Sequence, residues 1–320
     1  MPDGICFKLE LVPQSVPNSQ SHRQNRIRGF WLVLPQTSCG GKVKMSECTH
    51  DCGSCGEACA QRDPKSFLKA PNPGSHIKKV IAVVSGKGGV GKSLVTGISA
   101  VTARRHGFRT AVLDADITGP SAPKMLGLTY QDLQANESGL LPAETATGIK
   151  VMSMNLLMKK EDDPVIWRSP VITGTLEQFW TEVAWGNVDY MFIDMPPGTG
   201  DIPLTVFQTL PVDGIIVVTT PQELVSMIVK KAVGMAKLMN VPILGLVENM
   251  SYVKCPHCGE EIRLFGESRL EGIAEQEGLQ ILGRIPVDPA LAAACDAGRI
   301  EYFDGDYLSG LTSALPEIEA

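Results

Sequence analysis

The stretch that decides the fold is Ser85-Gly86-Lys87-Gly88-Gly89-Val90-Gly91-Lys92-Ser93. It matches the pattern G-x-x-x-x-G-K-[ST], and an apolar run at residues 80–84 comes directly before it. Between a strand and a helix, such glycines let successive backbone N–H groups curl around an anion, and the helix N-terminus adds its dipole. The stretch therefore predicts a phosphate-binding loop, the P-loop, from Gly86 to Ser93.

The lysines and the serine of this loop predict its ligand. Lys92 is placed to reach the β- and γ-phosphates of ATP, and the Ser93 hydroxyl is placed to bind Mg²⁺. Lys87 is a second lysine, early in the loop, although Lys92 already serves the phosphates. It could project across a dimer face toward a partner's nucleotide, as an arginine finger does, or it could be a solvated surface charge.

Aspartates follow two other apolar runs of the sequence. Asp114 and Asp116 end one run, and Asp194 ends another. Open α/β sheets bind ligands at the carboxyl ends of their strands, so Asp194 is predicted to hold Mg²⁺ through water. Asp201 closes a glycine-rich loop, residues 196–201, that is able to sense a γ-phosphate. Each aspartate taken alone could instead be a helix cap.

From residue 76 onward, short apolar runs alternate with helical stretches. The runs are rich in Val and Ile without polar alternation, which is typical of strands buried on both faces. The alternation predicts an α/β fold with a mostly parallel, doubly wound sheet and helices on both faces. The predicted strands are 80–84, 110–114, 150–154, 190–194, 214–219, 243–247 and 281–284. The predicted helices are 92–106, 171–184, 223–240, 267–277 and 289–297.

The chain divides into four zones by composition. Residues 1–44 are rich in Pro, Ser, Gln and Asn, and they predict either a disordered tail or a start assigned upstream of the true Met45. Residues 45–62 form a cysteine cluster. Residues 63–75 carry three prolines and are predicted to be a linker. Residues 76–320 are then the P-loop ATPase domain.

Charge and hydropathy exclude two classes of partner. The net charge is −6, with 35 acidic against 29 basic residues, which argues against nucleic acid because phosphate binding needs a basic face. No apolar run approaches the roughly 18 residues that span a bilayer, so no membrane association is expected. A short apolar run at residues 29–35 lacks a signal-peptide cleavage site. A cytoplasmic location is therefore expected.

Two of the nine cysteines form the pair Cys255-Pro256-His257-Cys258. In a reducing cytoplasm such spacing indicates metal binding or redox chemistry sooner than a disulfide. Two thiolates are too few for a metal that takes four ligands, but a two-fold axis would bring four cysteines together. Half a zinc knuckle, a thiol–disulfide pair and a loop without metal remain alternatives, and spacing alone slightly favours zinc.

Four more cysteines lie within twelve residues near the N-terminus: Cys48, Cys52, Cys55 and Cys59. They could hold a whole iron–sulfur cluster in one chain, and a small Cys₄ zinc site is the alternative. Cys295 lies at the end of an apolar run and is expected to be a buried structural cysteine.

The P-loop with its early lysine resembles the deviant-Walker-A class of ATPases, which includes the partition and division-site ATPases and the nitrogenase iron protein. Within that class the chain resembles the Mrp/ApbC family of iron–sulfur carriers over residues 78–307. The family commonly has Tyr where Thr118 stands and Gly where Ser169 stands, and neither departure touches a phosphate or metal role. The resemblance rests on D-A-D-I-T-G-P-S at 114–121, W-R at 167–168, I-D-M-P-P-G-T-G-D at 193–201, V-E-N-M-S at 247–251 and C-P-H-C-G at 255–259.

The resemblance implies a nucleotide-sandwich homodimer in which Lys87 acts on the partner's ATP. It also implies that Asp116 positions the attacking water and that Asn249 contacts adenine. Cys255 and Cys258 would hold a [4Fe–4S] cluster that bridges the dimer. The N-terminal cysteines resemble the cluster of the family's scaffold branch, which usually spaces its first cysteine further away.

The sequence thus predicts an ATP-hydrolysing iron–sulfur carrier or scaffold that delivers clusters to recipient apoproteins. A partitioning or positioning ATPase would use a basic patch or a membrane-seeking tail, whereas residues 308–320 hold two Glu and no Lys or Arg. A reductase similar to the nitrogenase iron protein would use single cysteines far apart in the chain. A non-enzymatic zinc scaffold is a third rival, against which the complete set of catalytic loops argues. A P-loop regulator with structural zinc is a further alternative.

Overall fold

The computed structural model describes residues 68–116, 121–130, 133–158, 169–198, 200–221 and 225–318. All of them belong to one of the two compact units into which the chain divides, residues 58–320. The predictions for residues 1–44 and 45–62 lie outside the described residues, as do those for Cys48, Cys52, Cys55 and Cys59. Thr118 and the W-R pair at 167–168 also lie outside them.

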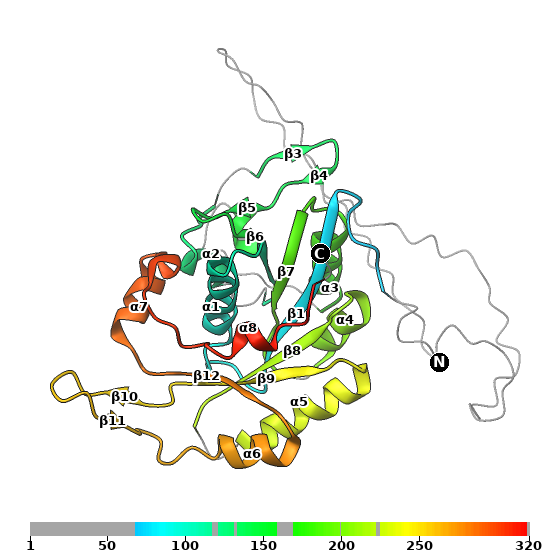
Figure 1. Cartoon of the computed structure of the whole chain (residues 1–320). Coiled ribbons are helices and arrows are strands. Elements are labelled where there is room, and N and C mark those ends of the chain that lie inside the picture. The colour runs from blue at the N-terminus through cyan, green and yellow to red at the C-terminus, as the bar shows by residue number, and fades with distance from the viewer. Residues whose placement is uncertain are drawn as a thin grey trace, which may run out of the picture. The chain divides into compact units, whose positions relative to one another are not determined.

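An eight-stranded sheet forms the centre of the described unit, with the strand order β12-β9-β8-β1-β7-β2-β6-β5 (Figure 1). Neighbouring strands run parallel throughout, except that β5 runs antiparallel to β6. The strands β2 and β8 are buried along their whole length, because helices cover both faces of the sheet. The bounds are β1 Ser75–Ser85, β2 Thr110–Asp114, β5 Ala143–Glu144, β6 Lys150–Met152, β7 Gly186–Asp194, β8 Gly214–Thr219, β9 Ile243–Asn249 and β12 Ile281–Ile285.

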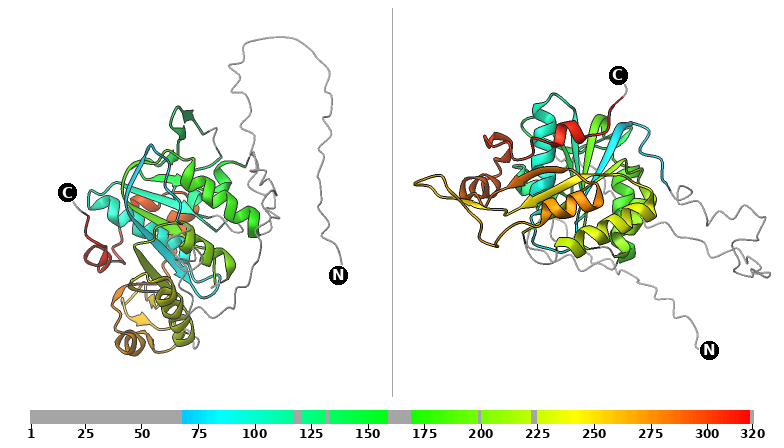
Figure 2. Two further views of the ribbon diagram at one scale, coloured as in Figure 1. Left: turned by 90° about the vertical axis from the view of Figure 1, so that its right-hand side faces the viewer. Right: turned by 60° about the horizontal axis from the view of Figure 1, so that its bottom comes forward.

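The helices form two groups, one on each face of the sheet (Figure 2). One apolar core packs the sheet against α3 (Ser169–Thr181), α4 (Asp201–Thr209), α5 (Val225–Met239) and α6 (Leu270–Glu277). The second core packs the opposite face against α1 (Lys92–Arg105), α2 (Ala122–Met125), α7 (Pro289–Asp296) and α8 (Leu311–Ala314). The predicted doubly wound α/β fold is confirmed. Among the described residues, no helix is long and apolar enough to cross a membrane.

Several predicted boundaries are wrong, and the helices α2, α4 and α8 were not predicted. The strand predicted to reach residue 154 ends at Met152, because Ser153 caps a 3-10 helix at Met154–Leu156 and accepts a bond from the Asn155 N–H. Helix α4 is nine residues long and begins at Asp201, the last residue of the predicted glycine-rich loop. Helix α6 begins three residues later than predicted, at Leu270.

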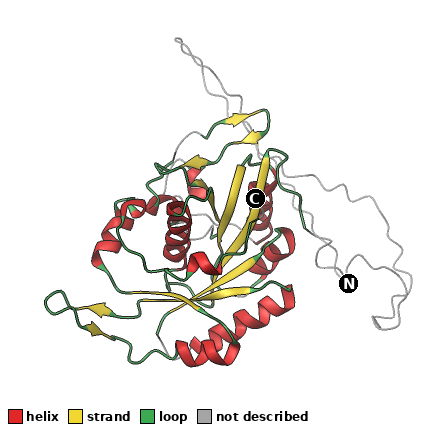
Figure 3. Cartoon of the chain, viewed as in Figure 1, coloured by secondary structure: helices red, strands yellow, loops and turns green. Residues whose placement is uncertain are grey.

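Two small hairpins were also not predicted. One pairs β3 (Ala135–Asn136) with β4 (Gly139–Leu140), and the other pairs β10 (Val253–Lys254) with β11 (Glu261–Ile262). Figure 3 shows both as short strand pairs outside the main sheet. Strands of two residues are too short to show the alternation by which a strand is recognised.

The last residues of the predicted linker contact the domain. The N–H of Lys69 donates to the carbonyl of Thr209 at 2.8 Å, and the N–H of Asn72 donates to that of Trp180 at 3.1 Å. The indole of Trp180 donates in turn to the Lys69 carbonyl at 2.9 Å. The chain is therefore fixed to α3 and α4 before β1 begins.

Candidate nucleotide site and cysteine hairpin

The glycine loop joins β1 to α1 at the carboxyl edge of the sheet. Gly89 and Gly91 have φ angles of 76° and 79°, in the left-handed region that favours glycine. At Gly91 there is a second reason for glycine, because a Cβ would stand 2.0 Å from the amide nitrogen of Asn249. The loop geometry is the one that the sequence motif requires for its N–H groups to converge.

A cavity of about 520 Å³ opens beside this loop. It is lined by the predicted site residues Lys87, Lys92, Ser93 and Asp116. The structure thus brings together side chains from the loop, from α1 and from the segment after β2. A cavity of this size is typical of small-ligand sites.

Lys92 lies between two of the predicted aspartates. Its side chain is 6% exposed, its amine bonds the fully buried carboxylate of Asp194, and it is 3.7 Å from Oδ2 of Asp116. Thr96 also donates to Oδ1 of Asp194, at 3.2 Å. Burial raises the pKa of Asp194, and the charge of Lys92 opposes that rise. The lysine therefore compensates a carboxylate that would otherwise be costly to bury.

Asp114 and Asp116 have different roles in the structure, although both were predicted to face the ligand edge. Asp114 is 1% exposed and lies in register with Asp194 on the neighbouring strand. Its carboxylate accepts bonds from the Ser153 hydroxyl and from the Asp116 N–H, each at 3.1 Å. Burial, and after it the charge of Asp194, raises the pKa of Asp114 well above its ordinary value. Asp114 therefore supports the turn, and Asp116 lines the cavity.

The oxygen atoms at this edge fit Mg²⁺. Asp194 Oδ2 is buried and has no hydrogen-bond partner within the described part of the chain. The Ser93 hydroxyl and the Asp116 carboxylate line the adjoining cavity. Hydroxyl and carboxylate oxygens with room for water are the environment that Mg²⁺ prefers.

Three predicted residues lie at the margin of the site. Lys87 lines the cavity of its own chain. Asn249 is 2% exposed, and its amide donates to the Val90 carbonyl at 2.9 Å, so it supports the loop from behind. Its predicted contact with adenine stays a prediction. Asp201 is the first residue of α4, directly after the loop that follows β7.

The sequence reasoning missed several side chains of the cavity, among them two polar ones near α2, and placed one cysteine wrongly. Ser121 and Lys124 line it from the start of α2. Cys295 was expected to be buried, but it is half-buried and lines the cavity from α7. Burial raises the pKa of its thiol, which keeps it protonated. No local pattern marks these residues, because only packing between α2 and α7 brings them to the loop.

The pair Cys255 and Cys258 lies at the turn of the β10–β11 hairpin. The Cys255 N–H donates to the Glu260 carbonyl, and the Gly259 N–H donates back to the Cys255 carbonyl, both at 2.9 Å. The N–H of Cys258, and after it that of His257, lowers the pKa of the Cys255 thiol by donating to it. A turn that aims N–H groups at sulfur favours a thiolate, which is the form that binds metal.

Within the part of the chain that the structure describes, no group of three or more His, Cys, Asp or Glu side chains is arranged to hold a metal. Cys255 is half-buried and Cys258 is exposed. The hairpin turn therefore offers two cysteine sulfurs, fewer than the four ligands that a zinc ion or an iron–sulfur cluster takes.

Comparison with known proteins identifies the family. The family model of the NUBPL iron-transfer P-loop NTPases matches residues 76–315. The chain belongs to this family. It is 46% identical to an iron–sulfur cluster carrier protein of Clostridium perfringens over 273 residues, which are 83% of this chain and 93% of that protein. It is 44% identical to a carrier protein of Methanocaldococcus jannaschii over 260 residues, 79% of this chain and 90% of the other.

Solved structures agree with this assignment. A nucleotide-binding protein of Archaeoglobus fulgidus in complex with ADP superposes with a TM-score of 0.67 at 41% identity, covering 76% of this chain and 94% of that one. A complex of the cell-division proteins MinC and MinD of Aquifex aeolicus matches with a TM-score of 0.51 at 20% identity, covering 74% and 94%. The second likeness shows the fold alone. This NUBPL-family chain is thus a nucleoside triphosphatase.

Proposed function

We propose that this chain is an ATP-hydrolysing carrier of iron–sulfur clusters that delivers them to recipient apoproteins in the cytoplasm. The observation that carries the proposal is that one domain of the iron-transfer family holds both a complete P-loop and a hairpin with two thiols at its turn. The proposed function needs ATP and reduced cysteines, and the cytoplasm supplies both.

The nucleotide half of the site follows from the residues at the cavity. Lys92 exchanges its carboxylate partners for the β- and γ-phosphates of ATP, which carry more negative charge. Ser93 and Asp194 would hold Mg²⁺, and the ion would supply positive charge to neutralise the charge that develops on the phosphates. Asp116 orients the attacking water, because it faces the cavity beside Lys92. Asp201 and the loop before it respond to the γ-phosphate.

The cluster half requires a second copy of the chain. A [4Fe–4S] cluster takes four thiolates, and Cys255 and Cys258 provide two. A two-fold axis at the hairpin turn supplies the other two and makes the functional unit a homodimer. In that dimer Lys87 acts on the partner's nucleotide. Cys48, Cys52, Cys55 and Cys59 would hold a second cluster within each chain.

A P-loop regulator with structural zinc is the alternative that the hairpin itself leaves open. Its two cysteines and its turn would serve half a zinc knuckle equally well. The family of iron-transfer NTPases favours iron. A positioning ATPase is supported only by neighbours that share the fold at low identity.

Anaerobic reconstitution with ferrous iron and sulfide tests the proposal. The expected product has the broad visible absorption of an iron–sulfur cluster and transfers it to an apo-ferredoxin-type acceptor. The Cys255→Ala, Cys258→Ala variant should keep ATP binding and lose the transfer, since the cavity does not include these residues. Preferential zinc uptake, with iron rejected under the same conditions, would establish the zinc regulator instead.

A further inference from the structure

The nucleotide cavity has two ends with different chemistry. At one end lies the P-loop, where Lys92, Ser93 and Asp116 are placed for the phosphates and Mg²⁺. The sugar of a nucleotide is joined to its phosphates, so it lies in the same cavity beyond the loop. The wall left for it comes from α2 and α7, and consists of Ser121, Lys124, Met125, Ala292, Cys295 and Asp296.

Backbone contact holds the two parts of this wall together. Gly127 follows α2 and Gly298 follows α7, with φ angles of 75° and 66°. A Cβ at Gly127 would stand 2.6 Å from the carbonyl oxygen of Gly298, and a Cβ at Gly298 would stand 2.7 Å from Cα of Gly127. No side chain fits between the two segments. The ends of α2 and α7 therefore lie directly against each other, and the wall is formed before any ligand binds.

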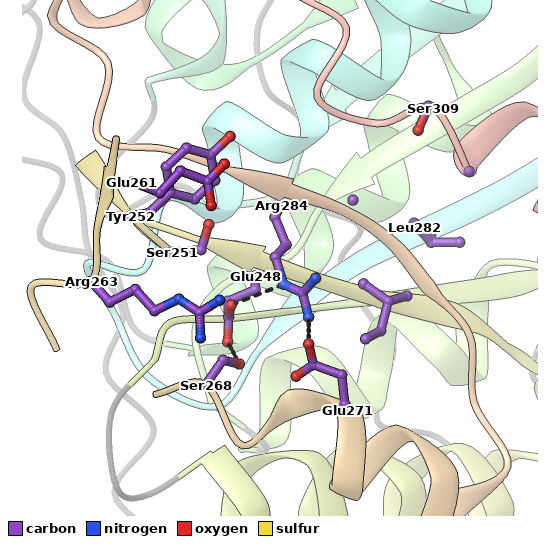
Figure 4. A pocket seen from close by; sticks show the side chains of 13 residues that line it. Glu248, Ser251, Tyr252, Glu261, Arg263, Ser268, Glu271, Leu282, Arg284 and Ser309 are labelled. Atoms are coloured by element: carbon purple, nitrogen blue, oxygen red, sulfur yellow. Dashed lines mark hydrogen bonds and ion pairs between the residues drawn. The ribbon is translucent and has the colours of Figure 1, made fainter. Parts of the chain in front are cut away.

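The wall carries two charged side chains of opposite sign. Lys124 and Asp296 both line the cavity, but neither forms an ion pair with another described residue. A second cavity, of about 500 Å³ beside β9 and β12, differs in this respect (Figure 4). There Arg284 bridges Glu248 and Glu271, so these charges are paired within the chain. The charges of the nucleotide cavity are available to a ligand.

Asp296 lies where a carboxylate does not stabilise the helix that carries it. It is the last residue of α7, and it is exposed. The C-terminus of a helix has a partial negative charge, so an acid there is unfavourable. After burial, which is the main cause, the charge of Asp296 also raises the pKa of the Cys295 thiol in the same cavity wall. Residues that break a rule of local stability are expected at functional sites.

We propose that Asp296 accepts hydrogen bonds from the ribose hydroxyls of the bound nucleotide and makes the site selective for ribonucleotides. The inference rests on the nucleotide-binding half of the proposed function. Ribose hydroxyls are donors, and an acidic side chain is the acceptor that dinucleotide-binding sites use for them. Lys124, on the α2 side of the cavity, offsets the repulsion between the Asp296 carboxylate and the phosphates.

Equilibrium binding to the nucleotide-free full chain tests the proposal. The two ligands are ADP and 2′,3′-dideoxy-ADP, both with Mg²⁺, because neither has a γ-phosphate to be hydrolysed during the measurement. Dissociation constants are measured by calorimetry for the wild type and for Asp296→Ala. The matched control is Asp304→Ala, because Asp304 is an exposed acid that does not line the cavity. Thermal unfolding checks the fold, and Asp296→Ala should not lower Tm, since it removes an acid from a helix C-terminus.

The wild type and the control should bind ADP about tenfold more tightly than 2′,3′-dideoxy-ADP, the effect of one hydrogen bond to a charged group. In Asp296→Ala the dissociation constant of ADP should rise about tenfold, while that of 2′,3′-dideoxy-ADP should not change. Asp296→Asn keeps an acceptor oxygen and should keep part of the preference. An Asp296→Ala variant that retains the full preference for ADP overturns the proposal.

Failure of the proposed function has a different signature. A wild-type protein that binds both ligands equally tightly overturns the ribose contact and leaves the carrier function as it stands. A wild-type protein that prefers ADP but takes up no iron and sulfide refutes the carrier function alone. A wild-type protein that binds neither nucleotide overturns both.

Discussion

Removal of the Lys92 amine should destabilise the protein even without nucleotide. Lys92 is 6% exposed and bonds the Asp194 carboxylate, which is fully buried and has one oxygen without a hydrogen-bond partner in the described chain. Lys92→Ala leaves this carboxylate without its cation. Breaking a buried ion pair in this way costs about 3–5 kcal/mol, which lowers Tm by roughly 10 °C for a domain of this size.

The cost should depend on pH with a defined sign. Burial already holds the pKa of Asp194 above its ordinary value, and loss of Lys92 removes the opposing charge. A carboxyl whose folded pKa exceeds its unfolded pKa binds its proton more tightly in the folded state. The destabilisation is therefore greatest at high pH and shrinks as the pH falls toward the unfolded value near ~4.

Chemical denaturation of nucleotide-free protein at pH 5 and pH 8 measures both effects. The double variant Lys92→Ala with Asp194→Asn should recover more than half of the lost stability, because the orphaned charge is gone. Lys79→Ala is the matched control: its amine lies 3.7 Å from Asp213, and both side chains are partly exposed, so about 0–1 kcal/mol is expected. A double variant as unstable as Lys92→Ala alone, or a loss independent of pH, would refute the reasoning.

Three further predictions concern other parts of the molecule. Asp114→Asn should raise the denaturation midpoint, because burial raises the pKa of Asp114 and its ionisation therefore opposes folding. The gain in midpoint should grow from pH 5 to pH 8, and a gain that shrinks as the pH rises would contradict this. Lys87→Ala should lower ATP hydrolysis, and mixing it with Asp116→Ala should restore part of the activity in heterodimers, whereas an absence of rescue would count against action across the dimer. Deletion of residues 1–62 should remove one cluster per chain and leave about one cluster per two chains, as counted by iron analysis; complete loss of iron would disprove an independent site at the hairpin.

The sequence predicted best the parts of the site that depend on local backbone geometry. The loop from Gly86 to Ser93 is specified by its own glycines, and Asp194 is placed by the strand that it ends. The sequence predicted least well the residues whose positions depend on tertiary packing. Asp114 and Asp116 are separated by one residue in the motif, but the first is buried and the second lines the cavity. Their positions at the end of one strand do not distinguish them, and only the family resemblance singled out Asp116.

The cysteine hairpin is a second region in which the sequence alone predicted only part of the structure. Its two thiols and their spacing were visible in the sequence, but the two-residue strands around them were not. Glu248 on β9 and Arg284 on β12 form an ion pair and line the same cavity as Glu261 and Arg263 of the hairpin segment. Only the folded chain brings these four side chains together. The surroundings of the hairpin are therefore a tertiary property.

Strand β9 connects the nucleotide site to the cysteine hairpin within a single domain. Asn249 at its end supports the P-loop through Val90, and Cys255 stands six positions further along the same backbone. Six residues span at most about 20 Å even when fully extended. The nucleotide site and the cysteine hairpin are consequently not separate modules. A hairpin grafted onto another protein would no longer respond to nucleotide. An insertion after Asn249 would uncouple the hairpin from the P-loop while each kept its own structure.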